Sequence, residues 1–195
     1  MSNPVLEVIK KRRSIRKYKL SQIMDNELAL IIEAGRFAPS GGNNQTTHFI
    51  VIQNEEILQE LKRLVVEEFA KMEVTENTYK SLKSSILQSK AGNYDFTYHA
   101  PTLIVVANAQ GYGNAMADCA VALENMMLAA ESLNIGSCWV NQLKWLSDND
   151  RIKQYMGKLG LAAGEVICGG LVLGYSDQPE AAPLERKGNR VTHIK

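Results

Sequence analysis

A short segment near the N-terminus is rich in Lys and Arg and contains one Ser. Seven of the ten residues in 10–19 are Lys or Arg. Guanidinium groups grip phosphate through paired hydrogen bonds, and a serine hydroxyl adds a donor. The candidate donors are Arg12, Arg13, Ser14 and Arg16. They predict either an anion site or a solvated face whose cations favour the C-terminal end of a helix.

Two glycine-bearing turns offer hydrogen-bonding groups to a planar ligand. Residues 39–45 read PSGGNNQ, and residues 134–139 read NIGSCW. Paired glycines let a backbone approach a ring closely, and Asn and Gln provide both donors and acceptors for the edge of a heterocycle. Each segment is also compatible with an ordinary loop, so neither predicts a site by itself.

Residues 111–116 have the outline of a dinucleotide-binding loop between a strand and a helix. Met116 occupies the third small position, where its bulk would block close packing of the helix on the strand. The acid expected at the end of the next strand is Glu131, which falls inside the following helix. The segment is therefore predicted to be a turn that starts a helix.

Nucleophilic and metal-binding patterns are missing from the sequence. It contains no Gly-x-Ser-x-Gly, and its three histidines show no ligand spacing. The cysteines are Cys119, Cys138 and Cys168. Their apolar surroundings predict inert core thiols, and their odd number and wide spacing favour a reducing compartment over a disulfide framework.

The elements that must position these residues mix helices with strands. Strands are expected at 48–53, 101–108 and 165–175, with a further extended segment at 137–140. Helices are expected from Asn3-Pro4, from a cap at Asp25 to before Pro39, after a cap at Asn54, at about 114–134, and from Ser147 with Asp150 completing a capping box. The mixture without strict alternation predicts an α+β fold with helices packed on a central sheet.

Two of these segments stand out. The helix at 114–134 is apolar nearly all round, which predicts a central position, buried in its own core or against a partner subunit. Residues 73–99 are polar and weakly patterned, and are expected to form a flexible helical excursion. Residues 176–195 are expected to form a C-terminal tail, so that 1–195 make a single domain.

Composition narrows the class of protein. The chain has 195 residues, 22 basic against 21 acidic, and a net charge of +1, so it lacks the overall field of a general nucleic-acid binder. A hydrophobic share of 45% excludes a disordered or collagen-like chain. Apolar runs are far shorter than the roughly 20 residues that cross a bilayer. A cytoplasmic protein without membrane or nucleic-acid partners is expected.

Taken together, four motifs resemble a known family. In chain order they are RRSIRKY, APSGGNNQTTHFIVI, DCAVALENMMLAAESLNIGSCWV and GGLVLGY, followed by a basic RK pair. This order resembles the nitroreductase family of FMN-dependent flavoproteins, over nearly the whole chain and least at 73–99. The resemblance implies a central, mostly antiparallel sheet flanked by helices, and a homodimer with FMN at the subunit interface.

The resemblance also implies FMN contacts at matching positions. The phosphate and ribityl chain are expected to contact Arg12, Arg13, Ser14 and Arg16. The loop that reaches the flavin from the other subunit matches Pro39, Ser40 and Gly41, followed by the N-x-Q positions Asn43 and Gln45, with Asn43 at the ring edge. The turn against the ring matches Ile135, Gly136 and Ser137. The pair that closes on the phosphate matches Arg186 and Lys187.

The chemistry agrees with these contacts. A nearly neutral protein needs local cations for a phosphate dianion, and the basic clusters at the two chain ends would supply them on one phosphate. Because a flavin carries the redox chemistry, no catalytic side chain or metal is expected. Many family members have Pro-Trp where this chain has Thr46-Thr47, a difference expected to reshape the pocket floor.

The expected activity is transfer of a hydride from NADH or NADPH to FMN and then reduction of a small planar acceptor, a nitroaromatic or a quinone, by a ping-pong mechanism. Three alternatives stay open. The first is another flavin chemistry of the family, such as dehalogenation, flavin fragmentation or azoline oxidation. The second is a non-catalytic flavin or nucleotide carrier. The third is a regulatory module that uses residues 10–19 as a nucleic-acid arm.

Overall fold

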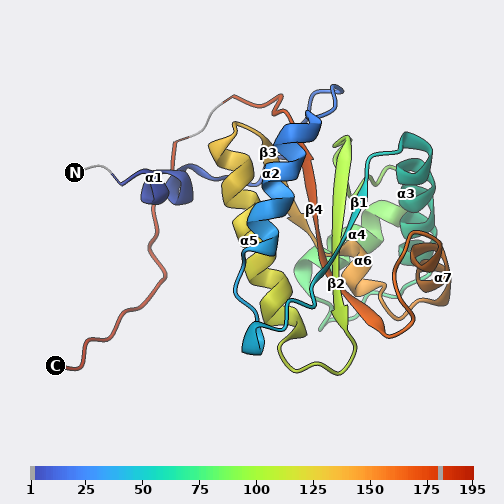
Figure 1. Cartoon of the computed structure of the whole chain (residues 1–195). Helices are drawn as coiled ribbons and strands as arrows, with labels where there is room; N and C mark the ends of the chain where they lie inside the picture. The colour runs from blue at the N-terminus through green and yellow to red at the C-terminus, as the bar shows by residue number, and fades with distance from the viewer. Residues whose placement is uncertain (1–2, 180–181) are drawn as a thin grey trace.

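A four-stranded antiparallel sheet forms the centre of the fold (Figure 1). The structure, a computed structural model, describes residues 3–179 and 182–195. The strands are β1 (His48–Ile52), β2 (Thr102–Ala109), β3 (Gly136–Val140) and β4 (Glu165–Gly174), in the spatial order β1-β2-β4-β3. All three pairings are antiparallel. The expected α+β fold with a mostly antiparallel central sheet is confirmed.

The central strand β2 is covered on both faces, as its continuous apolar sequence predicts. Seven of its eight residues are buried. Side chains alternate between the faces of a strand. Leu103 and Val105 therefore enter one hydrophobic cluster, whereas Ile104 and Val106 enter the other. The sheet thus separates two cores.

Helices cover each face of the sheet and give three layers (Figure 1). One face carries α2 (Asp25–Arg36) and α5 (Ala115–Ser132), whose Ile31 and Met126 are fully buried. The other face carries α3 (Glu55–Ala70), α4 (Lys80–Lys90), α6 (Gln142–Trp145) and α7 (Asp150–Lys158). Helix α1 (Pro4–Lys11) lies beside α5 and buries none of its residues. Helix α5 therefore packs one side on the sheet and leaves another side exposed.

Asparagine side chains start three of these helices. The Asn3 and Asn54 side chains accept hydrogen bonds from the backbone N–H groups of Val5 and Ile57, each at 3.0 Å, as predicted. Asp25 is the first residue of α2 rather than its cap, which is Met24. The expected start at Ser147 is wrong, because Asn149 caps α7 and the helix begins at Asp150. The short α6 was not foreseen.

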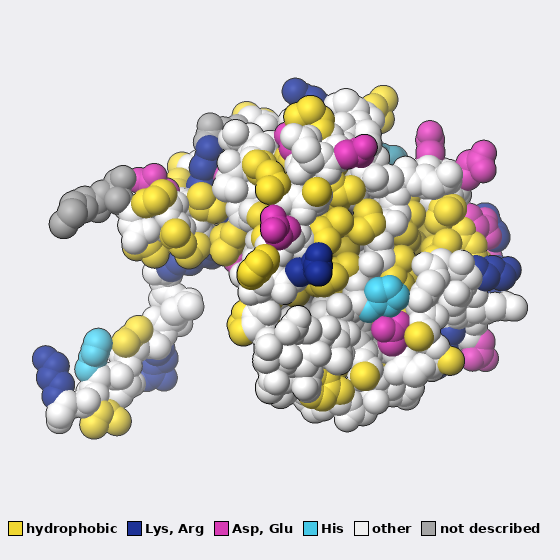
Figure 2. All heavy atoms as spheres, viewed as in Figure 1, with side chains coloured by type: hydrophobic (Ala, Val, Ile, Leu, Met, Phe, Trp, Pro, Cys, Tyr) yellow, Lys and Arg dark blue, Asp and Glu magenta, His cyan; other side chains and the backbone are white. Residues whose placement is uncertain are grey.

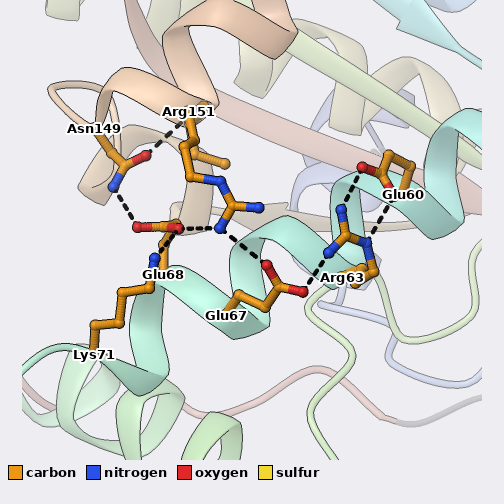
Figure 3. A network of polar contacts seen from close by, with 8 residues as sticks. Glu60, Arg63, Glu67, Glu68, Lys71, Asn149 and Arg151 are labelled. Atoms are coloured by element: carbon orange, nitrogen blue, oxygen red, sulfur yellow. Dashed lines mark hydrogen bonds and ion pairs between the residues drawn. The ribbon is translucent and has the colours of Figure 1, made fainter.

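A polar network joins α3 to α7 beside the core that contains Leu103 and Val105 (Figure 3). Its centre is Glu68, which is 6% exposed and accepts hydrogen bonds from Lys71, Asn149 and Arg151 at 2.5–2.8 Å. These donors, Lys71 first, lower the pKa of Glu68 to about 2. Arg151 also pairs with Glu67 at 2.9 Å. The network anchors α7, which follows the site-bearing β3 in the chain.

Two further segments complete the fold, and none of the described helices could span a membrane. The segment 73–99 contains α4 and closes against the sheet through the buried Phe96. The C-terminal tail at 182–195 is exposed and runs away from the body (Figure 1), while residues 180–181 of the expected tail lie outside the described residues. Within residues 3–179 and 182–195, every helix is too short or too polar to cross a membrane.

Candidate functional site

The basic segment after α1 lies in an extended conformation against the edge strand β3. The backbone N–H of Ile15 donates to the carbonyl of Ser137 at 2.9 Å, and Ser14 and Ser137 form a parallel bridge. The Tyr18 hydroxyl donates back to the carbonyl of Ile15 at 2.7 Å. These bonds bring together two of the predicted contact segments, 12–16 and 135–137, which lie more than a hundred residues apart in the sequence.

A cleft opens between this segment and the C-terminal end of α5. We call it the N-terminal cleft; its volume is about 220 Å³. Its lining includes four predicted site residues, Arg13, Ser14, Ile135 and Gly136. Lys11 adds a second cation and Glu131 a single acid. The cleft therefore combines a hydroxyl with an excess of positive charge, the donor set that suits a phosphate.

Close packing leaves little space for a side chain at Gly136. A Cβ atom there would lie 3.0 Å from Ile15 Cγ2 and 3.1 Å from the carbonyl oxygen of Gly174. Glycine lets β3 approach both the basic segment and the end of β4 without displacing either of them. Gly136 thereby holds the wall of the N-terminal cleft in place.

Arg12 and Arg16 point away from this cleft. Arg12 Nε lies 3.7 Å from Glu124 Oε1 on α5. The Arg16 guanidinium lies over the Tyr98 ring, 5.7 Å from its centroid, and lines a second, polar cleft with His99. Burial opposes the charge of Arg16, but neighbouring Cys138 and Tyr98 raise its pKa above the ordinary value. The structure thus places the four predicted N-terminal donors on three sides of one extended segment.

The second set of predicted residues forms a tight loop before β1. Gly41–Asn43 make a short 3-10 turn. The Ser40 hydroxyl closes the loop by accepting from the backbone N–H of Gln45 at 3.0 Å. Pro39, Ser40 and Gln45 line a separate cleft, the loop cleft, together with Arg36 and Asp118. Asn43 lies in the turn and is exposed.

The N-terminal cleft and the loop cleft lie at opposite ends of α5. Asp118 and Ala122, near the start of the helix, line the loop cleft, whereas Glu131, near its end, lines the N-terminal cleft. At a rise of 1.5 Å per residue, Ala122 and Glu131 are about 14 Å apart along the helix axis. One chain therefore keeps the two predicted halves of the site in separate clefts.

The C-terminal cations are the third predicted set, and one chain does not bring them to the basic segment. Arg186 and Lys187 are exposed on the tail, where Lys187 Nζ pairs with Glu185 at 2.9 Å. The start of the tail is anchored by Arg13, whose Nη1 donates to the carbonyl of Ala182 at 3.2 Å. Beyond that point the tail leaves the body (Figure 1).

The structure confirms that the cysteines are buried and that a turn precedes α5, and it adds one residue that the sequence analysis missed. Cys119, Cys138 and Cys168 are all buried, and burial raises the pKa of the Cys138 thiol. The 111–116 segment is the turn before α5, as predicted. Sequence reasoning missed Asp118, which is 5% exposed in the first turn of α5. The signal was an acid among the otherwise apolar residues of the first two turns of α5, because a buried carboxylate needs donors.

The chain matches known proteins along most of its length. A family described as the nitroreductase family matches residues 9–175. A Bacteroides fragilis structure, titled a nitroreductase with bound FMN, is 38% identical, with a TM-score of 0.84 over the full length of both chains. An Archaeoglobus fulgidus relative, named as a candidate NADH dehydrogenase/NAD(P)H nitroreductase, is 31% identical over 87% of this chain and 84% of its own. The NADPH-flavin oxidoreductase of Vibrio harveyi is 28% identical over 93% of this chain and 70% of its own.

Proposed function

Since the chain belongs to the nitroreductase family, we propose that it is a flavoprotein oxidoreductase that uses FMN as its cofactor and NADH or NADPH as its electron donor. Its acceptor is a small planar molecule, a nitroaromatic or a quinone, and the two half-reactions follow one another at one site. The N-terminal cleft carries this proposal, because a neutral protein gathers Lys11, Arg13 and Ser14 there beside a tightly packed glycine.

The residues of the N-terminal cleft suit FMN. Arg13 and Ser14 would hold the phosphate, with Lys11 adding charge. Gly136, which lines the cleft without a side chain, would leave room for the ring beside β3. When bound, FMN supplies the redox chemistry, taking up a hydride from the nicotinamide and giving electrons to the acceptor. The chain's own task is to bind and orient the FMN and its substrates and to exclude water from them.

A second copy of the chain would complete the site. Helix α1 exposes Val5, Leu6 and Ile9 to 62%, 50% and 44%, and α5 exposes Met116 and Val121 to 40% and 39%. Figure 2 shows hydrophobic side chains gathered on α1 and on the face formed by α2 and α5. Such an apolar surface favours association with a second copy. In a homodimer, the 39–45 loop of one chain would reach the FMN held by the N-terminal cleft of the other.

The tail fits the same arrangement. Because Arg186 and Lys187 lie on an extended segment that leaves the body, they would close on a phosphate held across the dimer interface rather than within their own chain. Arg13, which donates to the backbone at the start of the tail, would then connect the cations of the basic segment with those of the tail. Thr46 and Thr47, which follow the loop, would shape the floor on which the acceptor lies.

An absorption spectrum of the purified protein tests this proposal. We expect a yellow protein, or a colourless one that takes up added FMN in a one-to-one ratio with the chain. Anaerobic NADH or NADPH should bleach the flavin band, and a nitroaromatic or a quinone should restore it. Failure to take up FMN, or a bound flavin that neither nicotinamide reduces, would contradict the proposal.

A further inference from the structure

The 39–45 loop has a backbone conformation that needs support. Gly42, Asn43 and Gln45 have φ values of 62°, 56° and 53°, in the left-handed region. This region is uncommon for residues with a side chain, least so for Asn. Such residues persist only where the surrounding structure holds them. The contacts that hold this loop therefore decide whether its amide side chains are ready for a ligand.

Asp118 supplies the first contact. Its two carboxylate oxygens lie 3.1 and 3.3 Å from the backbone nitrogen of Gly41, immediately before the left-handed residues. The Tyr112 hydroxyl lies 3.1 Å from Asp118 Oδ2. Asp118 is 5% exposed, so these donors offset the cost of burying its charge. A carboxylate is thus committed to the backbone of the loop.

Tyr112 supplies the second contact. The one hydrogen of its hydroxyl is shared between Asp118 and the carbonyl oxygen of Gly41, 3.2 Å away, and its oxygen accepts a bond from Asn44 Nδ2 at 3.3 Å. A Cβ atom at Gly41 would lie 2.5 Å from this hydroxyl and 2.2 Å from Asn114 Nδ2. The turn before α5, which the sequence presents as an imperfect dinucleotide loop, is therefore packed directly against the 39–45 loop.

We propose that Asp118, together with Tyr112, is a positioning residue that sets the 39–45 loop in its flavin-binding conformation before FMN arrives. This inference rests on the proposed function in one respect, that the loop contacts FMN. Asp118 acts through the backbone of Gly41 and through Tyr112. A loop that is already ordered gives up less conformational entropy when its ligand binds, which raises affinity.

Two substitutions at Asp118 test these contacts of Asp118 and Tyr112 with the 39–45 loop, which we call the clamp. Asp118→Ala leaves the Gly41 N–H without its charged acceptor, and FMN should bind about tenfold to a hundredfold more weakly. Asp118→Asn keeps an oxygen for the Gly41 N–H, and its amide can donate to the Tyr112 hydroxyl. This variant should restore most of the affinity. Tyr112→Phe provides a milder loss if Asp118→Ala fails to fold.

Asn125→Ala is the matched control. Asn125 also lies on α5, but its side chain donates to the carbonyl of Ala34 on α2 at 3.1 Å rather than to the 39–45 loop. It should lower the melting temperature without weakening FMN binding. Two readouts are measured for every variant, the FMN dissociation constant by fluorescence titration and the hydrogen exchange of residues 40–46 in protein freed of FMN.

Faster exchange of 40–46 and weaker FMN binding in Asp118→Ala, with recovery in Asp118→Asn, would support the clamp. If Asp118→Ala matches Asn125→Ala in both readouts, the clamp is refuted. The absence of FMN binding by the unmodified protein would overturn the proposed function instead. In that case the exchange of the loop would still decide whether Asp118 holds it.

Discussion

Replacement of Gly136 by alanine tests the wall of the N-terminal cleft. The new methyl group would meet Ile15 Cγ2 at 3.0 Å and the carbonyl oxygen of Gly174 at 3.1 Å. The carbonyl belongs to the paired strand β4, so we expect the basic segment to move outward by a few tenths of an ångström instead. Ile15 is itself bonded to Ser137. Overpacking of this kind costs about 1–3 kcal/mol.

For a chain of this length, that loss corresponds to a fall in melting temperature of about 2–12 °C. The same displacement moves Arg13 and Ser14 relative to β3, so we expect FMN to bind at least about tenfold more weakly, a change of about 1.4 kcal/mol. Thermal unfolding of FMN-free protein and fluorescence titration with FMN measure the two effects separately.

Gly157→Ala is the control for the same chemical change. Gly157 lies in α7, and a Cβ atom there would meet nothing within 4 Å. Alanine in a helix is favoured over glycine by about 0.5–1 kcal/mol, so this variant should be more stable than the unmodified protein. If Gly136→Ala melts at the unmodified temperature and retains FMN, the argument from packing at Gly136 is wrong.

Three further predictions address acid stability, the tail and the core. The pKa of Glu68 is lowered to about 2 from an ordinary 4.5, so the stability that Glu68 contributes is present above pH 4.5 and is lost as the pH falls toward 2. In urea unfolding, the Glu68→Gln variant should therefore lose less stability than the unmodified protein over that pH range. Replacing Arg186 and Lys187 by Gln should weaken FMN binding and reduce its salt dependence, measured by titration at two salt concentrations, while the melting temperature of FMN-free protein stays unchanged. Leu103→Ala, at a fully buried position of β2, should lower the unfolding free energy by about 2–5 kcal/mol in urea titrations.

Local chemistry accounts for the elements that the sequence predicts well. Asn3 and Asn54 cap their helices through bonds to residues two or three positions ahead, and such contacts are readable from the sequence. The start of α7 is not readable in this way. Ser147 and Asn149 are both good caps, and Asn149 is held by a further bond to Glu68 at 2.8 Å, a residue 81 positions away.

The same distinction applies to the candidate site. The motifs indicate which segments contribute, and the structure brings 12–16 and 135–137 together. They do not indicate where each side chain points. Arg12 and Arg16 are directed by Glu124 and Tyr98, which lie on distant segments. Asp118 was missed because its partners, Gly41 and Tyr112, become neighbours only in the folded chain.

The length of helix α5 fixes the distance between the two clefts of the chain. Its 18 residues run without a break from the loop cleft to the N-terminal cleft. One residue inserted in its middle would turn everything beyond it by about 100° and lengthen it by 1.5 Å, which would misalign the two ends. Insertions at residues 73–79, before α4, would leave this spacing intact. The fold can therefore change in length around its candidate site but not along the helix that spans it.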